Sequence, residues 1–374
     1  MELTDFYGQF IISDSSMEAP DHFAIKKCNE WYVYHHSSLL IRPLILENGE
    51  TWGWVLGYPI AGGIFLQGDD PLYIRPIPAE DRKSFAYHST AGISGRYLVL
   101  ADNATFRYRA LIPDPFCSLS CVFDPKARLA ASTTSLLRFS RDSYQPALES
   151  IDAHKTKTYY PFGATDDSSI KRLLPNHELS LENWDTRRFW PMSNLLPDDD
   201  SSSPDHVAAA FRSVTANIVA IGMAHNRVYS GLTAGRDSRV MLACTPPAIR
   251  DKTFYYTWQA LPEERFHGND CDIQTAKLLA KRHRLNHRVY PTQRPSEIER
   301  KIYSDSIGHP GNAVTNPSYY YRNFIEHAEI SSAAAMFGFG GEVSVAYYLK
   351  EKDENSTPAA ADILGRMVLP RATE

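Results

Sequence analysis

The most informative part of the chain reads Arg227-Val228-Tyr229-Ser230-Gly231-Leu232-Thr233-Ala234-Gly235-Arg236-Asp237-Ser238-Arg239. An apolar run passes here into small residues and then into charged ones, a pattern that predicts a strand, a tight loop and the first turn of a helix. In an open α/β sheet such a loop lies at the carboxyl end of its strand, and the N–H groups of the helix favour an anion there. The pattern therefore predicts a phosphate-binding loop.

Four residues of this loop have side-chain properties that suit a phosphate chain. Thr233 and Ser238 carry hydroxyl donors, and Gly235 lets the backbone approach an anion closely. Asp237 has the carboxylate that holds a Mg²⁺ bridging phosphate oxygens. On spacing alone the segment is equally a tight strand-to-helix turn with Asp237 as N-cap, and this alternative stays open.

Downstream of the loop, short apolar runs alternate with helical patterns, which predicts an α/β unit with a parallel sheet. The strands are expected at Val228–Leu232, Thr253–Trp258, His287–Tyr290 and Ala334–Gly338, and the helices at Asp237–Cys244, Cys271–His283, Ser296–Ser306 and Pro317–Glu329.

Upstream of the loop the pattern is different. Aromatic and β-branched runs such as Trp52–Tyr58, Phe106–Ala110 and Leu119–Phe123 predict a mostly β domain over residues 1–192. A polar and acidic stretch, 193–204, is expected to be the linker to a second domain at 205–374. Apolar residues at helical spacing after Ser203-Pro204-Asp205 predict that this domain begins with a helix.

Composition excludes several classes of protein. Hydrophobic residues make up 43% and charged residues 22% of the 374, which excludes extended disorder. The formal charge of −5 gives no global footprint for nucleic acid or an anionic membrane, although it leaves open a local basic groove. No apolar run approaches the roughly 20 residues of a membrane span, and the chain starts with acidic residues, so a cytoplasmic location is expected. Five cysteines without paired CxxC spacing argue against a disulfide framework or a zinc site.

The segment Thr233–Ser238 resembles the SGGxDS pyrophosphate loop of the ATP-pyrophosphatase (PP-loop) superfamily, in the version of asparagine-synthetase-like proteins. Thr233 replaces the first Ser and Ala234 the first Gly. Three further segments resemble the family and lie in the order that the family has: Lys171–His177 upstream of the loop, and His267–Ala276 with His287 and Gly338–Glu342 with Tyr347-Tyr348 downstream of it. The resemblance implies an adenine nucleotide α-hydrolase-like fold for the C-terminal domain.

The resemblance also implies a set of site residues. ATP and Mg²⁺ would be the cofactors, with the pyrophosphate held by Thr233, Ala234, Gly235, Arg236, Asp237 and Ser238, and the metal held by Asp237 and Glu342. Phe339 stands where asparagine synthetase has a glutamate beside its substrate. Asparagine is therefore not the expected product.

The N-terminal half resembles, through Gly95–Val99 and Ala131–Leu137, a class II glutamine amidotransferase domain, an Ntn-type α+β fold. That chemistry needs a cysteine made N-terminal by removal of Met1, and position two is Glu2. The half is expected to be degenerate, without glutamine hydrolysis. The family continues further after its last glycine-rich turn than this chain does after Tyr348, so a truncated member, or one completed by a partner chain, is expected.

The predicted function is ATP-dependent amide-bond formation through an acyl-adenylate, with a carboxylate-bearing small molecule or peptide and an amine as substrates, and with no nucleic-acid or membrane partner. Two alternatives belong to other classes. One is a catalytically inactive nucleotide-binding or scaffold protein. The other is an ATP-pyrophosphatase acting on RNA, which requires a basic face with aromatic platforms that the sequence does not make evident.

Overall fold

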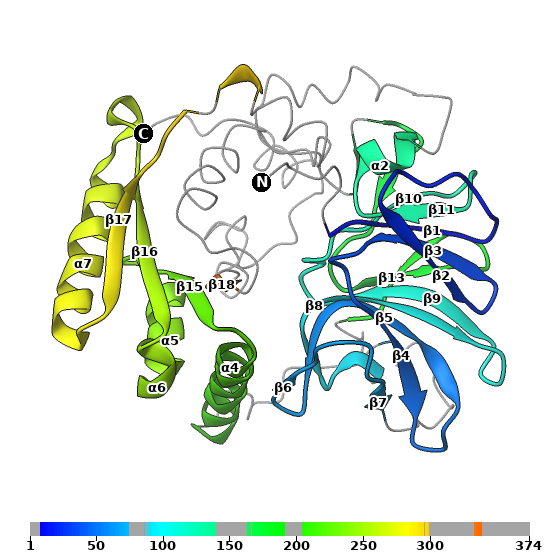
Figure 1. Ribbon diagram of the computed structural model, residues 1–374, viewed down its shortest axis with the longest axis horizontal. Helices are drawn as coiled ribbons and strands as arrows, with labels where there is room; N and C mark the ends of the chain where they lie inside the picture. Colours follow the sequence, from blue (N-terminus) through cyan, green and yellow to red (C-terminus); the bar gives the residue numbers. More distant parts are fainter. Residues whose placement is uncertain are drawn as a thin grey trace, which may run out of the picture. The chain divides into compact units, whose positions relative to one another are not determined.

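The computed structural model describes residues 8–74, 86, 89–139, 163–165, 167–190, 204–294, 296–298 and 333–338. These residues belong to two compact units (Figure 1). The N-terminal unit comprises the described residues of 8–62 and 66–190, and the C-terminal unit comprises 63–65 and the described residues from 204 onward. Several sheets and helices are present, one of the sheets parallel, so the predicted mixed α/β class is confirmed.

The N-terminal unit consists of two sheets and a short helix. Its strands are β1 (Phe10–Ser13), β2 (Phe23–Cys28), β3 (Trp31–His36), β4 (Ile41–Leu46), β5 (Thr51–Ala61), β7 (Leu72–Ile74), β8 (Ile93–Asn103), β9 (Tyr108–Pro113), β10 (Val122–Asp124), β11 (Leu129–Ala131), β12 (Lys171–Arg172), β13 (His177–Ser180) and β14 (Thr186–Arg188), and its helix is α2 (Thr134–Phe139). The short strand β6 (Ile64–Phe65) belongs to the C-terminal unit. The sheet orders are β12-β10-β11-β1-β3-β2 and β14-β13-β9-β8-β5-β4-β7. Among the described strands of these two sheets, β4 and β7 pair in parallel, and the other pairings are antiparallel.

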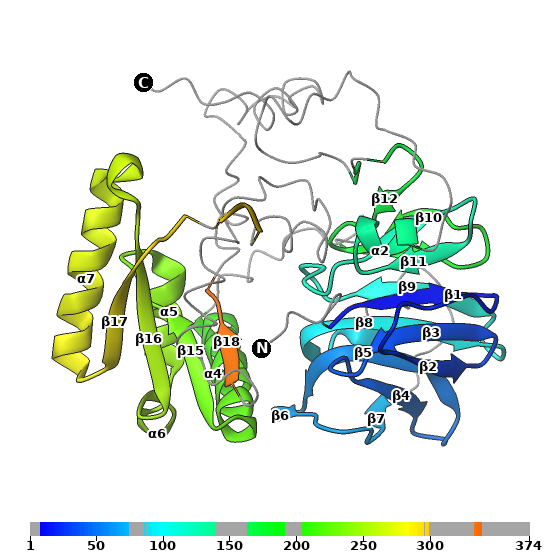
Figure 2. The ribbon, with the colours of Figure 1, turned by 45° about the horizontal axis from the view of Figure 1, so that its top comes forward.

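The core of the N-terminal unit lies between the two sheets, which Figure 2 shows as stacked layers. Because side chains alternate along a strand, Phe10, Trp31 and Val33 of the first sheet point to the same side. Leu98 and Leu100 of β8 meet them from the second sheet, and all five side chains are buried. The arrangement is that of a β-sandwich, with α2 covering the outer face of the first sheet.

Two predicted strands begin later than expected. The run Phe106–Ala110 was expected to be strand throughout, but β9 starts at Tyr108 because Arg107 adopts the left-handed conformation of a turn, with φ 48°. The run Leu119–Phe123 is strand only from Val122, the first residue of β10, because the residues before it form a loop held by a buried carboxylate.

Asp114 supplies that carboxylate and is only 2% exposed. It accepts hydrogen bonds from the backbone N–H groups of Tyr97 (3.3 Å), Phe116 (3.0 Å), Ser118 (3.0 Å) and Leu119 (3.2 Å), and from the Ser118 hydroxyl (2.8 Å). The Tyr97 and Leu119 amides are buried, and buried N–H groups without partners are costly. One side chain therefore takes the place of a sheet neighbour.

The C-terminal unit contains a four-stranded parallel sheet, so the sheet predicted for this half is confirmed. The order is β17-β16-β15-β18, visible from left to right in Figure 2. Its elements are α4 (Pro204–Ala224), β15 (Arg227–Gly231), α5 (Arg236–Cys244), α6 (Pro247–Arg250), β16 (Thr253–Gln259), η1 (Pro262–Glu264), α7 (His267–His283), β17 (Asn286–Pro291) and β18 (Ala333–Met336).

The predicted elements of this unit match the observed ones with small shifts. The helix expected from Cys271 begins at His267, and the strand expected to end at Gly338 ends at Met336. The helix predicted at 317–329 lies outside the described residues, as does most of the one at 296–306. Glu342 and Phe339 lie outside them as well.

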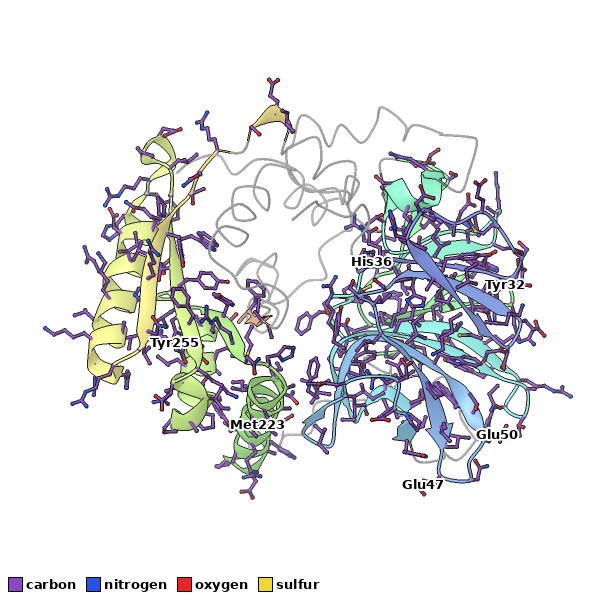
Figure 3. The ribbon with its side chains drawn as sticks, in the orientation of Figure 1. Tyr32, His36, Glu47, Glu50, Met223 and Tyr255 are labelled. Atoms are coloured by element: carbon purple, nitrogen blue, oxygen red, sulfur yellow. The ribbon has the colours of Figure 1, made fainter. Side chains whose placement is uncertain are left out.

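The described helices of the C-terminal unit pack against one face of its sheet. Val228 lies in a cluster with Ile218 of α4 and Cys244 of α5. Tyr255 of β16 is 1% exposed and lies in a second cluster with Ala276 of α7 (Figure 3). Val228 and Tyr255 are on neighbouring parallel strands, so this face is the one that the helices cover.

Helix α4 is longer and more apolar than the prediction of no membrane-span-like segment allows. It has 21 residues, and a stretch of 18 of them has a mean hydropathy of 1.5. In this stretch 17% of the residues are buried. Met223, labelled in Figure 3, is 74% exposed. The prediction that no segment has the length and composition of a membrane span is therefore wrong for this helix. Core helices of soluble proteins pass the same test, so α4 alone does not identify a membrane protein.

Candidate functional site

The candidate site lies where the strand order of the parallel sheet reverses. From β15 the chain proceeds to β16 and β17 on one side, and later returns to β18 on the other side of β15 (Figure 2). In open α/β sheets ligands bind outside the carboxyl ends of the strands at such a switch point. The loop Leu232–Gly235 joins β15 to α5 at this point.

Gly338 brings the end of β18 against the first turn of α5. A Cβ atom placed on it would lie 2.8 Å from the carbonyl carbon of Asp237, 2.9 Å from its oxygen and 3.0 Å from the amide nitrogen of Ser238. Only a residue without a side chain permits this approach. Two segments about 100 residues apart in the sequence, both singled out by the sequence, therefore meet at the switch point.

The amino end of α5 has no side-chain cap. Gly235 is the N-cap residue, with φ −61° and ψ 150°, and no side chain accepts a hydrogen bond from the helix N–H groups there. Asp237, the N-cap in the alternative interpretation of the sequence, lies instead within the first turn. Arg236 and Arg239 are exposed on the same turn. Because the first N–H groups of a helix lack intrahelical partners, this end carries partial positive charge.

The two hydroxyls of the loop bond to the loop itself. The Thr233 Oγ1 and Ser238 Oγ atoms are 3.1 Å apart, and Ser238 is only 9% exposed. The Thr233 amide donates to Ser238 Oγ (3.1 Å), and the Gly235 amide donates to Thr233 Oγ1 (3.0 Å). Both hydroxyls therefore fix the shape of the loop in this structure, in addition to any part in ligand binding.

Two side chains from other elements, Asp272 and Thr257, bond to the loop directly, and a third, His287, bonds to Thr257. No role for Asp272 or Thr257 was predicted from the sequence. Asp272 of α7 accepts a hydrogen bond from the Ala234 amide (2.8 Å). Thr257 of β16 donates its hydroxyl to the Leu232 carbonyl (2.6 Å), and since its one proton is used there, it accepts from His287 Nε2 (2.9 Å). The only sequence signal was that Asp272 falls in the segment resembling the family's Asp-led helix.

His287 makes the stability of this arrangement depend on pH. Burial lowers the pKa of its imidazole, and the positive charge of Lys277 lowers it further. The folded state therefore favours the neutral ring, and the unfolded chain binds the proton more readily. We expect the free energy of unfolding of the C-terminal unit to be constant above about pH 6.5 and to fall as the pH drops below that value.

The measurement is chemical denaturation between about pH 7.5 and about pH 5 for the wild type and His287→Gln. The wild type should lose more stability across this interval than the variant. Since His35 and His36 of the N-terminal unit also have lowered pKa values, the difference between the two proteins isolates the contribution of His287. Identical pH profiles would contradict the assignment.

The structure describes one of the two predicted metal ligands, Asp237. Among the described residues, no three or more His, Cys, Asp or Glu side chains gather in a way that could hold a metal ion. Asp237 is half-buried beside Gly338, and Glu342, its predicted partner, is four residues further along the chain, beyond the described part.

No protein-family model matches the chain, and a search of curated proteins finds no match either. The functional assignment therefore depends on the residues of the loop and on their geometry.

Proposed function

We propose that the C-terminal unit binds Mg-ATP at Thr233–Ser238 and uses it for amide-bond formation, as an asparagine-synthetase-like protein with a PP-loop domain. The observation that carries the proposal is the contact of Gly338 with the first turn of α5, beside an uncapped helix end at the switch point of a parallel sheet. An extended anion such as a triphosphate needs close backbone approach, open N–H groups and positive charge.

Each part of the loop has a role in this proposal. The helix N–H groups and Gly235 would receive the pyrophosphate part of ATP, and Arg236 or Arg239 would add positive charge. Asp237, with Glu342, would hold the Mg²⁺. In the reaction, a substrate carboxylate attacks the α-phosphorus, pyrophosphate leaves, and an amine then displaces AMP from the acyl-adenylate.

The N-terminal unit would then be a degenerate glutamine amidotransferase-like domain of the Ntn type that does not hydrolyse glutamine. Burial raises the pKa of the Cys28 and Cys117 thiols to about 12, and it also raises the pKa of the Cys121 thiol well above its usual value. Protonated thiols are weak nucleophiles, so none of these three cysteines has the activated form that amide hydrolysis requires. A structural or substrate-binding role follows for this unit.

A second candidate function has its own supporting observation. The Ala234 amide and the hydroxyls of Thr233 and Ser238 are already bonded to protein atoms, which leaves fewer donors for a phosphate. The remaining donors are enough for a protein that binds a nucleotide, or acts as a scaffold, without catalysing a reaction. The two candidates differ in whether pyrophosphate is released once ATP is bound.

Calorimetry with ATP, in the presence and absence of Mg²⁺, tests the proposal. We expect weak Mg-dependent binding by the wild type, and loss of the Mg²⁺ dependence in Asp237→Ala because the metal loses a ligand. Asp270→Ala is the matched control, since Asp270 is an acid of α7 that pairs with Arg265. No ATP binding by the wild type would refute the proposal, and binding without pyrophosphate release for any carboxylate and amine would favour the scaffold.

A further inference from the structure

Helix α7 carries a dense group of exposed positive charges at its carboxyl end. Between Asp272 and Glu297 the chain has six Lys and Arg residues and no Asp or Glu. Five exposed side chains of this region form what is called here the α7 basic ridge: Lys277, Lys281, Arg282, His283 and Arg284. None of the five forms an ion pair with any residue in the part of the chain that the structure describes.

Helix capping explains only part of this ridge. Cations in the last turn of a helix offset its dipole, which accounts for Lys281, Arg282 and His283. Lys277 is a turn earlier, and Arg284 lies beyond the helix as its left-handed C-cap residue, with φ 52°. Lys277 and Lys281 are four residues apart, so they lie on one side of the helix, and Arg284 follows just beyond its end. The positive field of Lys277 also reaches inward, where it helps to lower the pKa of His287.

The ridge is separate from the candidate ATP site. Helix α7 connects the carboxyl end of β16 to the amino end of β17, so it runs antiparallel to the strands. Its carboxyl end therefore lies near the amino ends of the strands, whereas the loop Leu232–Gly235 lies at their carboxyl ends. In Figure 1 the carboxyl end of α7 is its lower end. A partner on the ridge would leave the ATP site accessible.

We propose that the α7 basic ridge binds the sugar-phosphate backbone of a nucleic acid. Rows of exposed Lys and Arg without acidic partners are complementary to phosphodiester chains, and such binding needs no contact with the bases. An anionic membrane is the poorer fit. The apolar face of α7, with Ile273 and Ala276, is buried against the sheet, which leaves Leu278 as the exposed apolar side chain between the ridge cations. The composition argued against nucleic acid because the whole chain has a net charge of −5, a sum that does not show the local excess of positive charge on α7.

Fluorescence anisotropy with a labelled single-stranded RNA, and in a second arm a DNA duplex, tests the proposal on the full chain. We expect both to bind, since the backbone is common to them. If four cations of the ridge contact phosphates, RNA affinity should fall about 50-fold from about 50 mM to about 200 mM salt. Reversing these charges should weaken RNA binding at least about tenfold and flatten the salt dependence. The variant combines Lys277→Glu, Lys281→Glu, Arg282→Glu and Arg284→Glu.

The control makes the same change in net charge on the N-terminal unit, at four exposed cations scattered over its surface: Arg107→Glu, Lys126→Glu, Lys171→Glu and Arg188→Glu. It should bind RNA within about twofold of the wild type at about 200 mM salt, where long-range charge effects are screened. Thermal melting of both variants and Mg-ATP calorimetry check that they are folded. Equal RNA binding by the ridge variant and the wild type would overturn the proposal. So would binding of phosphatidylserine vesicles without binding of RNA.

Discussion

Asp114→Ala is expected to lower the free energy of unfolding of the N-terminal unit by at least about 3 kcal/mol, because two buried N–H groups lose their acceptor at about 1–3 kcal/mol each and three part-buried donors lose theirs as well. The carboxylate is 2% exposed and accepts hydrogen bonds from four backbone amides and one hydroxyl. Alanine removes the acceptor of the buried Tyr97 and Leu119 amides and of the part-buried donors of Phe116 and Ser118. Denaturation followed by tryptophan fluorescence measures the effect, since five of the six tryptophans precede residue 191.

Two further variants make this test specific. Asp185→Ala removes an exposed carboxylate of the same unit and should change stability by less than about 0.5 kcal/mol. Asp114→Asn keeps the shape but turns an amide NH₂ toward N–H groups, so an intermediate loss is expected. If Asp114→Ala stayed within about 1 kcal/mol of the wild type, the loop would have other acceptors for these amides.

Gly338→Ala is expected to disrupt the candidate site directly. The new methyl group would lie 2.8 to 3.0 Å from backbone atoms of Asp237 and Ser238, and backbone cannot move aside as the end of a side chain can. The end of β18 must therefore move away from α5. We expect the C-terminal unit to lose about 2 kcal/mol of stability, a typical cost of overpacking, and Mg-ATP affinity to fall at least about tenfold.

Gly231→Ala is the matched control, because it adds the same methyl group at the end of β15, close to the same loop. Its Cβ would contact only the Tyr256 ring, at 3.9 Å or more, which is an ordinary packing distance. This variant should therefore keep both stability and Mg-ATP affinity near those of the wild type. If Gly338→Ala bound Mg-ATP as tightly as Gly231→Ala does, the approach of β18 to α5 would have no part in nucleotide binding.

The elements that carry the candidate site could be predicted from the sequence because their signals are local. The apolar run at Val228–Leu232 marks β15, and the small residues after it mark the loop, since a strand or a tight turn depends on neighbours a few residues away. Helix α5 begins one residue before the predicted Asp237 and ends at the predicted Cys244. In the run Phe106–Ala110 the predicted start of the strand was two residues too early. The strand starts after Arg107, whose left-handed conformation had no signal in the sequence.

Contacts between distant segments were decided by the tertiary structure. The order β17-β16-β15-β18 places Gly338 against Asp237, and the packing of α7 brings Asp272 to the Ala234 amide across 38 positions of sequence. Five donors converge on Asp114 for the same reason. No short window of sequence contains both partners of such a contact, because the partners are chosen by the pairing of strands and the burial of faces. The residues of the loop could be predicted from the sequence, because they are neighbours in the chain. The groups that hold them in place, and the exposure of the positive charges of α7, were decided by the tertiary structure.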